Sequence, residues 1–249
     1  MQAIYLFLFN YTHIREWVAQ PLINIHGLLI LNLCRSRRQN GEIYMNVRVI
    51  NNYHTDENTY LIYNKRTGVV IDPGCRTDEI LKIAAVAGVK IKFIFITHCH
   101  YDHIEYLDEL RRETGAKLIS SEKGAENVSN PSINMTLLGL GEQLRPKTPE
   151  IIMKDRQTIT IDGMKIKCLY TPGHTSCGAS YLTEIGVFTG DTLFLRSCGR
   201  WDLPTGDEET LKKSIRERLY TLNDDLTVYP GHGQKTSIGY EKKFNMFVK

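Results

Sequence analysis

The chain has 249 residues, of which 42% are hydrophobic and 24% are charged, and its formal net charge is +3. This composition is ordinary for a globular protein with a sizeable core, and it excludes a low-complexity or fibrous chain. Four of the 31 basic and two of the 28 acidic residues lie in residues 1–44, which leaves 27 and 26 in the remainder. The main part of the chain is therefore charge-balanced, and no nucleic-acid partner is expected.

Residues 1–44 differ in texture from the rest of the chain. Their apolar runs, residues 3–9 and 22–33, are too short or too interrupted for a membrane span, which needs about 20 apolar residues, and no secretory signal pattern accompanies them. Strand-like patterning begins at Met45. We predict that residues 1–44 are an N-terminal extension, either an over-extended start or a loosely packed arm. A peripheral membrane anchor is the alternative. Residues 45–249 are expected to form one folded domain without a membrane partner.

The six cysteines are scattered along the chain, and none has C-x-x-C spacing. In a chain of this length, that usage favours reduced thiols and a cytoplasmic location over a disulfide framework.

From Met45 onward the sequence predicts strands and helices in two batches. The continuous apolar run at residues 93–96 is typical of a strand buried on both faces, and Gly88 is suited to end a helix. Residues 121–157 are mixed and are expected to include a loop over the site. The arrangement predicts one domain of two packed sheets with helices outside. Strands are expected at residues 47–51, 59–63, 68–71, 93–96, 117–120, 158–162, 165–170, 179–183, 186–189 and 226–229, and helices at residues 77–86, 104–112 and 207–220.

The strongest signal is the segment Thr97-His-Cys-His-Tyr-Asp-His103, directly after the predicted buried strand. His98 and His100 are two residues apart, so both imidazoles point to the same side of an extended segment. Asp102 and His103 follow where a helix is expected to begin, and they can turn back toward the same space. Imidazole nitrogen and carboxylate oxygen are ligands that borderline divalent metals prefer. The cluster therefore predicts a metal site.

Three further candidate ligands arrive singly, each directly after a glycine. Glycine permits tight turns and close backbone approach, which helps a side chain to reach a crowded metal centre. Each short motif alone is equally consistent with an ordinary turn or a hydrogen-bonded residue, and the four motifs in this order are what indicate a site. Seven nitrogen and oxygen ligands are too many for one tetrahedral zinc, and they suit two metals that share a bridging carboxylate. The predicted ligands are His98, His100, Asp102, His103, His174, Asp191 and His232.

From about Met45 to His232 the chain resembles the metallo-β-lactamase superfamily, and within it the single-domain, glyoxalase II-like (hydroxyacylglutathione hydrolase-like) branch. The resemblance rests on the T-H-x-H-x-D-H cluster followed by G-H-T, G-D-T and a final G-H. It implies an α+β fold, the four-layer αββα sandwich, with the metals at one edge between the sheets. It also implies two ligand sets bridged by Asp191. The first set is His98, His100 and His174, and the second set is Asp102, His103 and His232.

Two features refine this resemblance. Zinc β-lactamases commonly have cysteine at the position of Asp191, so the aspartate argues against β-lactam hydrolysis as the native reaction. Only 17 residues follow His232, so the C-terminal helical domain that supplies glutathione contacts in long glyoxalase II enzymes is not expected. The segment Cys198-Gly-Arg-Trp-Asp202 resembles the thioesterase-like branch, in which Arg200 and Asp202 would support the ligands from outside. A surface ion pair is the alternative for these two residues.

The resemblance implies a metal-dependent hydrolase that cleaves a small thioester, such as a hydroxyacylglutathione, by attack of a metal-bridging hydroxide. Asp102 and Asp191 would be catalytic as well as metal-binding. Zinc is the expected metal, and iron and manganese suit the same ligands. The alternatives are a lactonase or phosphodiesterase of the same fold, an iron-dependent sulfur dioxygenase, and a non-catalytic metal-binding protein. The oligomeric state is left open.

A nucleophilic side chain is a further alternative at two positions. Cys99 lies between two candidate ligands, but alternation along an extended segment points its thiol away from them, so we expect it to pack in the core. Ser176 follows His174 closely. A metal-bound histidine cannot also act as a general base, so a Ser–His pair is not expected.

Overall fold

The structure is a computed structural model that describes residues 34–35 and 45–248. The predictions for residues 1–44 therefore lie outside the described residues, apart from strand β1 (Cys34–Arg35), which pairs antiparallel with strand β2. The proposed boundary at Met45 stays a prediction. Within the described ranges, no helix is both long enough and apolar enough to cross a membrane.

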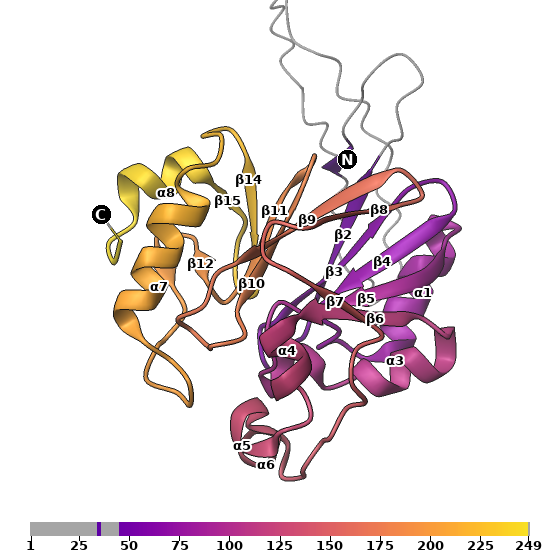
Figure 1. The fold of residues 1–249 in the computed structure, drawn as a ribbon. Helices are drawn as coiled ribbons and strands as arrows, with labels where there is room; N and C mark the ends of the chain where they lie inside the picture. The colour runs from indigo at the N-terminus through magenta and orange to yellow at the C-terminus, as the bar shows by residue number, and fades with distance from the viewer. Residues whose placement is uncertain (1–33, 36–44, 249) are drawn as a thin grey trace, which may run out of the picture. The chain divides into compact units, whose positions relative to one another are not determined.

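The first half of the described chain builds a seven-stranded sheet in the order β1-β2-β3-β4-β5-β6-β7 (Figure 1). Strands β1 to β4 are antiparallel neighbours, and β4 to β7 run parallel. Parallel strands need crossover connections, and helices supply them here. The bounds are β2 Asn46–Asn51, β3 Asn58–Tyr63, β4 Thr67–Ile71, β5 Lys90–Phe95, β6 Lys117–Ser121 and β7 Ile151–Met153.

The second half builds a six-stranded sheet in the order β15-β14-β11-β10-β9-β8. Strands β8 to β11 form an antiparallel meander, and β14 joins β11 in parallel. A small hairpin of β12 and β13 follows β11. The bounds are β8 Thr158–Ile161, β9 Met164–Tyr170, β10 Ala179–Thr183, β11 Gly186–Gly190, β12 Leu193–Phe194, β13 Ser197–Cys198, β14 Thr227–Pro230 and β15 Thr236–Ser237.

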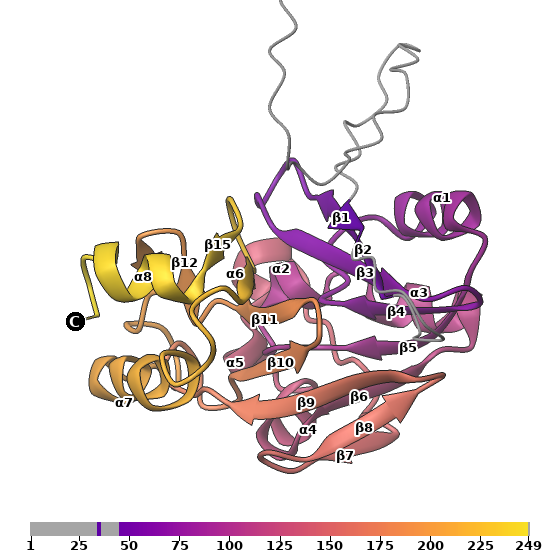
Figure 2. The ribbon, with the colours of Figure 1, turned by 90° about the horizontal axis from the view of Figure 1, so that it is seen from above.

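Helices cover the outer face of each sheet (Figure 2). Buried residues of α1 and α3 pack on one face of the first sheet, and those of α7 and α8 pack on the second sheet. A third apolar cluster, which includes Phe95, Tyr181 and Phe188, lies between the sheets. The predicted four-layer αββα sandwich is confirmed. The helices are α1 Thr77–Ala87, α2 Tyr101–Ile104, α3 Leu107–Thr114, α4 Glu122–Asn127, α5 Pro131–Asn134, α6 Thr136–Leu140, α7 Glu208–Ser214 with a following π-helical turn Ile215–Leu219, and α8 Ile238–Phe244.

Two buried tyrosines join the sheets at the edge where the predicted ligands lie. The Tyr181 hydroxyl on β10 donates to Ile96 O, just after β5, at 2.8 Å. The Tyr60 hydroxyl on β3 donates to Pro230 O, at the end of β14, at 2.6 Å. Each ring also packs edge-on against an aromatic ring of the other strand layer. These contacts join β10 to the end of β5 and β3 to the end of β14, and so connect the two sheets at this edge.

The structure differs from the predicted elements in three places. The helix predicted at residues 104–112 is two helices, α2 and α3, because the chain bends at Tyr106, whose N–H donates to Pro73 O instead of continuing the first helix. Residues 121–157 contain α4, α5, α6 and β7, and Gly139 of α6 packs against the ring of Tyr101. The expected loop over the site stays a prediction. The short strands β12, β13 and β15 and helix α8 were not predicted.

Candidate metal centre

The ligands predicted from sequence follow the carboxyl ends of four strands. Strand β5 leads into residues 98–103, β9 into His174, β11 into Asp191 and β14 into His232. The tyrosine contacts described above connect the two sheets at the ends of β5 and β14. Each sheet therefore delivers part of the set to one edge of the sandwich, and the structure brings all seven residues together.

His98, His100 and His174 form one cluster, in which one ligand atom from each residue lies within 4.8 Å of the others. All three side chains are buried. His174 Nε2 faces His100 Nδ1 at 2.9 Å. The other nitrogen of His174, Nδ1, donates to the carbonyl oxygen of Arg200 at 2.6 Å. A histidine held through one ring nitrogen presents the other nitrogen in a fixed direction, as metal ligation requires.

Asp102, His103 and His232 form a second cluster with the same spread of ligand atoms. His232 Nε2 lies 3.2 Å from Asp102 Oδ2, and His103 Nε2 lies 3.8 Å from the same oxygen. His103 is fully buried, whereas the side chain of His232 is 24% exposed. This cluster therefore forms the more open side of the site.

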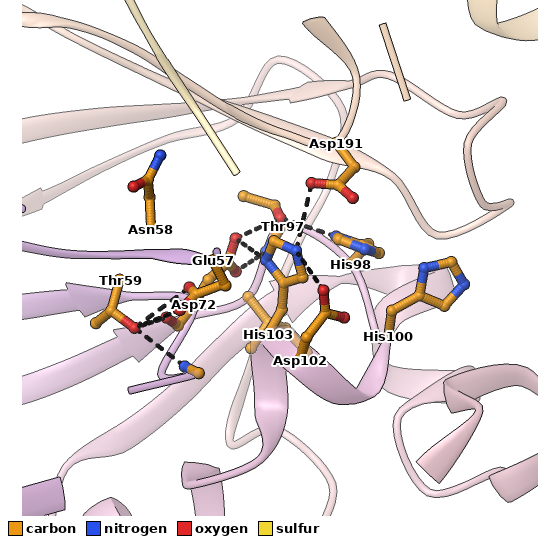
Figure 3. Close-up of polar contacts among 12 residues, drawn as sticks. Glu57, Asn58, Thr59, Asp72, Thr97, His98, His100, Asp102, His103 and Asp191 are labelled. Atoms are coloured by element: carbon orange, nitrogen blue, oxygen red, sulfur yellow. Dashed lines mark hydrogen bonds and ion pairs between the residues drawn. The ribbon is translucent and has the colours of Figure 1, made fainter. Parts of the chain in front are cut away.

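Asp191 lies between the two clusters (Figure 3). Its Oδ1 is 3.3 Å from His103 Nε2, and its Oδ2 is 3.5 Å from both His174 Nε2 and His232 Nε2. One carboxylate thus reaches imidazoles of both clusters. A carboxylate in this position has the geometry expected of a bridging ligand between two metals.

Buried polar atoms without partners mark the same place. Five buried side-chain nitrogen or oxygen atoms of the described residues lack a hydrogen bond, and four of them belong to the candidate ligands. An unpaired buried polar atom costs about 1–3 kcal/mol, so a cluster of four indicates a missing partner. The donor set of neutral imidazoles and carboxylates fits a divalent cation. The four atoms are His98 Nε2, His100 Nε2, His103 Nε2 and Asp191 Oδ1.

The electrostatics of the site separate neutral ligands from charged ones. Burial lowers the pKa of His98 well below its usual value and lowers that of His100 to about 4, so both rings are neutral and keep a free lone pair. Burial also lowers the pKa of His103, but Asp191 and Asp102 raise it more, and the net pKa lies well above the usual value. Burial likewise lowers the pKa of His232, but its hydrogen bond with Asp102 and the charge of Asp191 raise it more, so its net pKa is also raised. The metal-free site therefore favours protonation of His103 and His232 beside the two carboxylates.

Asp72 is the principal site residue that the sequence did not reveal. Its carboxylate is buried, and it accepts hydrogen bonds from Thr97 N at 2.6 Å, from Thr97 Oγ1 at 2.6 Å and from His103 Nδ1 at 3.0 Å. Thr97 Oγ1 in turn contacts His98 Nδ1 at 3.1 Å. One carboxylate thus fixes His103 directly and His98 through Thr97, which leaves the Nε2 atom of both rings pointing into the site.

Glu57 and Thr59 support the turn that carries Asp72, and Figure 3 shows them beside it. Thr59 Oγ1 donates to Asp72 O at 2.7 Å and accepts from Gly74 N at 3.1 Å. Gly74 is confined, because an added Cβ would lie 1.9 Å from Asp102 O and 2.5 Å from Glu57 Oε2. Burial raises the pKa of Glu57 well above its usual value, opposed by the positive charge of His103. Glu57 therefore packs as a neutral acid behind the ligands.

Arg200 and Asp202 form an exposed ion pair with each other, with both side chains 62% exposed and two N–O contacts of 2.7 Å. Their side chains thus form the surface ion pair that was the alternative prediction. This segment supports the site through its backbone instead, because the carbonyl oxygen of Arg200 accepts a hydrogen bond from His174. Cys99 is buried, and its Sγ faces Cys177 Sγ at 3.4 Å. Its thiol packs in the core, as predicted from the alternation.

The comparisons with known proteins agree with this geometry. The sequence pattern of the Metallo-beta-lactamase superfamily matches residues 54–232. A "Probable metallo-hydrolase" of Streptococcus pyogenes is 37% identical over 82% of this chain and 91% of its own length. The "Hydroxyacylglutathione hydrolase GloC" of Haemophilus influenzae is 30% identical over 82% of this chain and 98% of its own. The crystal structure of the BLEG-1 B3 metallo-beta-lactamase superposes with a TM-score of 0.71 at 26% identity, covering 88% of this chain and all of that one.

The chain belongs to the metallo-beta-lactamase superfamily. Its site is a metal site, and its relatives include hydrolases that act on small molecules. The protein is therefore a metallo-hydrolase of this superfamily.

Proposed function

We propose that this protein is a binuclear metallo-hydrolase that cleaves small thioesters of the hydroxyacylglutathione class. The observation that carries the proposal is the position of Asp191, whose two oxygens reach imidazoles of both clusters within 3.5 Å. The similarity to GloC over nearly its whole length supports the substrate class.

In this proposal each cation has three protein ligands of its own, and both cations share the seventh ligand. His98, His100 and His174 would hold the first metal, and Asp102, His103 and His232 would hold the second. Asp191, which lies within reach of both groups, would be the shared ligand. Two divalent ions supply a hydroxide at neutral pH and an electrophile for the carbonyl oxygen. We favour zinc, because five of the seven ligands are imidazoles. Iron and manganese accept the same ligands.

The carboxylates of Asp102 and Asp191 have a second role beyond metal binding. Both carboxylates lie beside His232 at the site. There they would accept a hydrogen bond from the attacking water and so direct its lone pair at the thioester carbon. Water adds to this carbon, the C–S bond breaks, and the products are a carboxylic acid and a thiol. A thiol has a pKa of about 8.5, so the sulfur leaves without prior protonation, and no dedicated general acid is needed.

The state of the cysteines is consistent with a reducing compartment. The five cysteines whose side chains are described are all free, and Cys99 and Cys177 keep their thiols with the sulfur atoms 3.4 Å apart. Such a pair would be expected to oxidise in an oxidising compartment. We therefore place the protein in the cytoplasm, with a small-molecule substrate.

The test is hydrolysis of S-lactoylglutathione by protein loaded separately with zinc, iron and manganese, with metal content measured for each sample. Asp191→Ala is expected to lose bound metal and turnover together. Arg200→Ala is the control, because its exposed side chain pairs only with Asp202 and its carbonyl oxygen is retained. A metal-replete sample that hydrolyses a lactone, a phosphodiester or a β-lactam but no thioester would refute the substrate class. A fully active Asp191→Ala variant with two metals would refute the bridging role.

A further inference from the structure

The loop that carries His232 is held by a residue from the opposite sheet. We call residues 230–233, which begin at the last residue of β14, the His232 loop. Asn58, the first residue of β3, makes three hydrogen bonds to carbonyl oxygens of this loop. Asn58 N donates to Gly231 O at 2.7 Å, and Asn58 Nδ2 donates to Pro230 O at 3.1 Å and to Gly233 O at 2.9 Å.

The side chain of Asn58 is matched to this task. It is 2% exposed, and its Oδ1 accepts a hydrogen bond from Asn51 Nδ2, so every polar atom of the amide has a partner. An amide nitrogen offers two donors in one plane, which a hydroxyl or a carboxylate does not. Asn58 and Thr59 alternate along β3 and point to opposite sides of the strand (Figure 3). Asn58 thus serves the His232 loop, whereas Thr59 serves the turn at Asp72.

The His232 loop has little room to shift without disturbing the site. An added Cβ at Gly231 would lie 2.2 Å from Asp191 Oδ1 and 2.8 Å from His103 Cε1, so the loop backbone packs directly on two candidate ligands. One further bond, from Gly231 N to Gly190 O at 2.9 Å, holds the loop from its own sheet. In Asn58→Ala the loop keeps that bond, the backbone bond from Asn58 N to Gly231 O and the bond from the Tyr60 hydroxyl to Pro230 O. It loses the two bonds that Asn58 Nδ2 donates to Pro230 O and Gly233 O.

The first cluster has separate supports. His174 is fixed by the carbonyl oxygen of Arg200, and His98 is fixed by Thr97. The hydrogen bonds of Asn58 go instead to Asn51 and to the His232 loop. The two side-chain bonds are at Pro230 and Gly233, on either side of His232, whereas Gly231, which packs on Asp191 and His103, stays held by two backbone bonds. A change to the Asn58 side chain therefore acts on His232 and not on the shared ligand Asp191.

We propose that Asn58 is a positioning residue for the second metal alone, so that its removal converts a two-metal site into a site that fills only its first position under limiting metal. This inference rests on the two-metal site proposed above. Supporting residues outside the ligand set typically change metal affinity about 10–100-fold. We expect Asn58→Ala to weaken the second binding step by a factor in that range and to leave the first step unchanged.

The experiment is a titration of the metal-free protein with Co²⁺, with visible absorption and a competing chelator resolving the two steps. Asn64→Ala is the matched control. Asn64 is a buried asparagine just beyond the other end of β3, and its Nδ2 donates to Asp162 O at 2.7 Å. Urea unfolding of each metal-free variant measures the loss of fold stability separately. If Asn58→Ala does not fold, Asn58→Ser keeps one donor and is expected to weaken the second step by a smaller factor.

Selective weakening of the second step in the Asn58 variants, with both steps normal in Asn64→Ala, supports the inference. Two normal steps in Asn58→Ala would overturn it. Equal weakening of both steps, in proportion to lost fold stability and matched by Asn64→Ala, would also overturn it, because Asn58 would then be a general fold residue. A wild-type protein that takes up a single Co²⁺ would instead refute the two-metal site itself, and that failure is visible before any variant is made.

Discussion

Replacement of Asp72 by Asn is expected to weaken metal binding about 10–100-fold while the fold remains intact. His103 binds a cation through Nε2 only if its Nδ1 carries the proton, and Nδ1 lies 3.0 Å from Asp72 Oδ2, which accepts that proton. An asparagine that keeps its oxygen toward Thr97 N places its NH₂ group against His103 Nδ1. Two donors then face each other, and the ring relieves the conflict by moving its proton to Nε2, the ligating atom.

The contacts of Asp72 determine how much stability and metal affinity we expect Asp72→Asn and Asp72→Ala to lose. Asp72→Asn preserves volume and can still accept from Thr97 N, so we expect a stability loss of about 1 kcal/mol. We expect metal affinity to fall about 10–100-fold, which corresponds to about 1.4–2.8 kcal/mol. Asp72→Ala leaves the buried N–H of Thr97 and that of His103 without partners, at about 1–3 kcal/mol each. Its expected stability loss is therefore about 2–6 kcal/mol, a large part of the total for a domain.

The assay is urea unfolding of the metal-free variants together with Co²⁺ titration of each. Glu150→Gln is the control, since Glu150 also accepts from a backbone N–H, that of Leu118 in β6, and from a side chain, Arg111. Glu150 lies directly before β7, at the strand end opposite the ligands. Asp72→Asn should bind Co²⁺ about 10–100-fold more weakly with a stability loss of only about 1 kcal/mol, and Glu150→Gln should bind Co²⁺ as the wild type does. An Asp72→Asn variant that binds metal as tightly as the wild type would refute the tautomer argument.

Three further predictions concern individual groups. The raised pKa of His103 in the metal-free protein adds to the free energy of unfolding. This contribution is complete below about pH 6.5 and is lost as the pH rises through the folded-state pKa of His103. Urea unfolding between pH 6 and 9 should therefore show declining stability, and a flat profile would contradict this prediction. Gly173 has a φ of 130°, and a Cβ added there would lie 2.2 Å from the backbone of Leu211, whereas Gly88 also has a positive φ but open space around it. Gly173→Ala should therefore lower the free energy of unfolding by about 2–4 kcal/mol more than Gly88→Ala. Equal decreases in melting temperature for the two variants would refute the predicted clash. Cys99→Ala should keep its metal and its turnover and should lose about 1–2 kcal/mol of stability, because the buried thiol only packs in the core. A variant that binds metal fully but is inactive would instead support Cys99 as a nucleophile.

The ligand residues could be predicted because their chemistry is local. The spacing of His98, His100, Asp102 and His103 places four ligands within one short segment, and no knowledge of distant contacts is needed to recognise it. The strand before it is marked by a continuous apolar run. The fold class followed from the same kind of signal, because strand and helix periods can be read from neighbouring residues.

The supporting residues could not be predicted because their partners are distant in sequence. Asn58 bonds to residues 172 and 175 positions away, and nothing around it distinguishes it from any polar residue at a strand start. Asp72 was visible only as part of a turn that ends β4, although an acidic residue after a buried strand is the pattern shared by Asp191. Helix α8 was hidden because the buried side of the helix carries Glu241, whose carboxylate accepts from Arg196 N and other donors. A charged residue in a core position breaks the apolar period by which a helix is recognised.

The division of ligands between the sheets gives the metals a structural role as well as a chemical one. The first sheet supplies the ligands of residues 98–103, and the second sheet supplies His174, Asp191 and His232. Each proposed metal therefore takes ligands from both sheets. Direct protein contacts across this edge, such as Tyr181 to Ile96 and Asn58 to the His232 loop, hold the two ligand groups close before a cation binds. A cation stabilises only the folded state, because only that state presents the complete set of ligands. At a free cation concentration a thousand times Kd, binding therefore adds about 4 kcal/mol to the free energy of unfolding. The site that performs the chemistry thus also ties together the two halves of the fold.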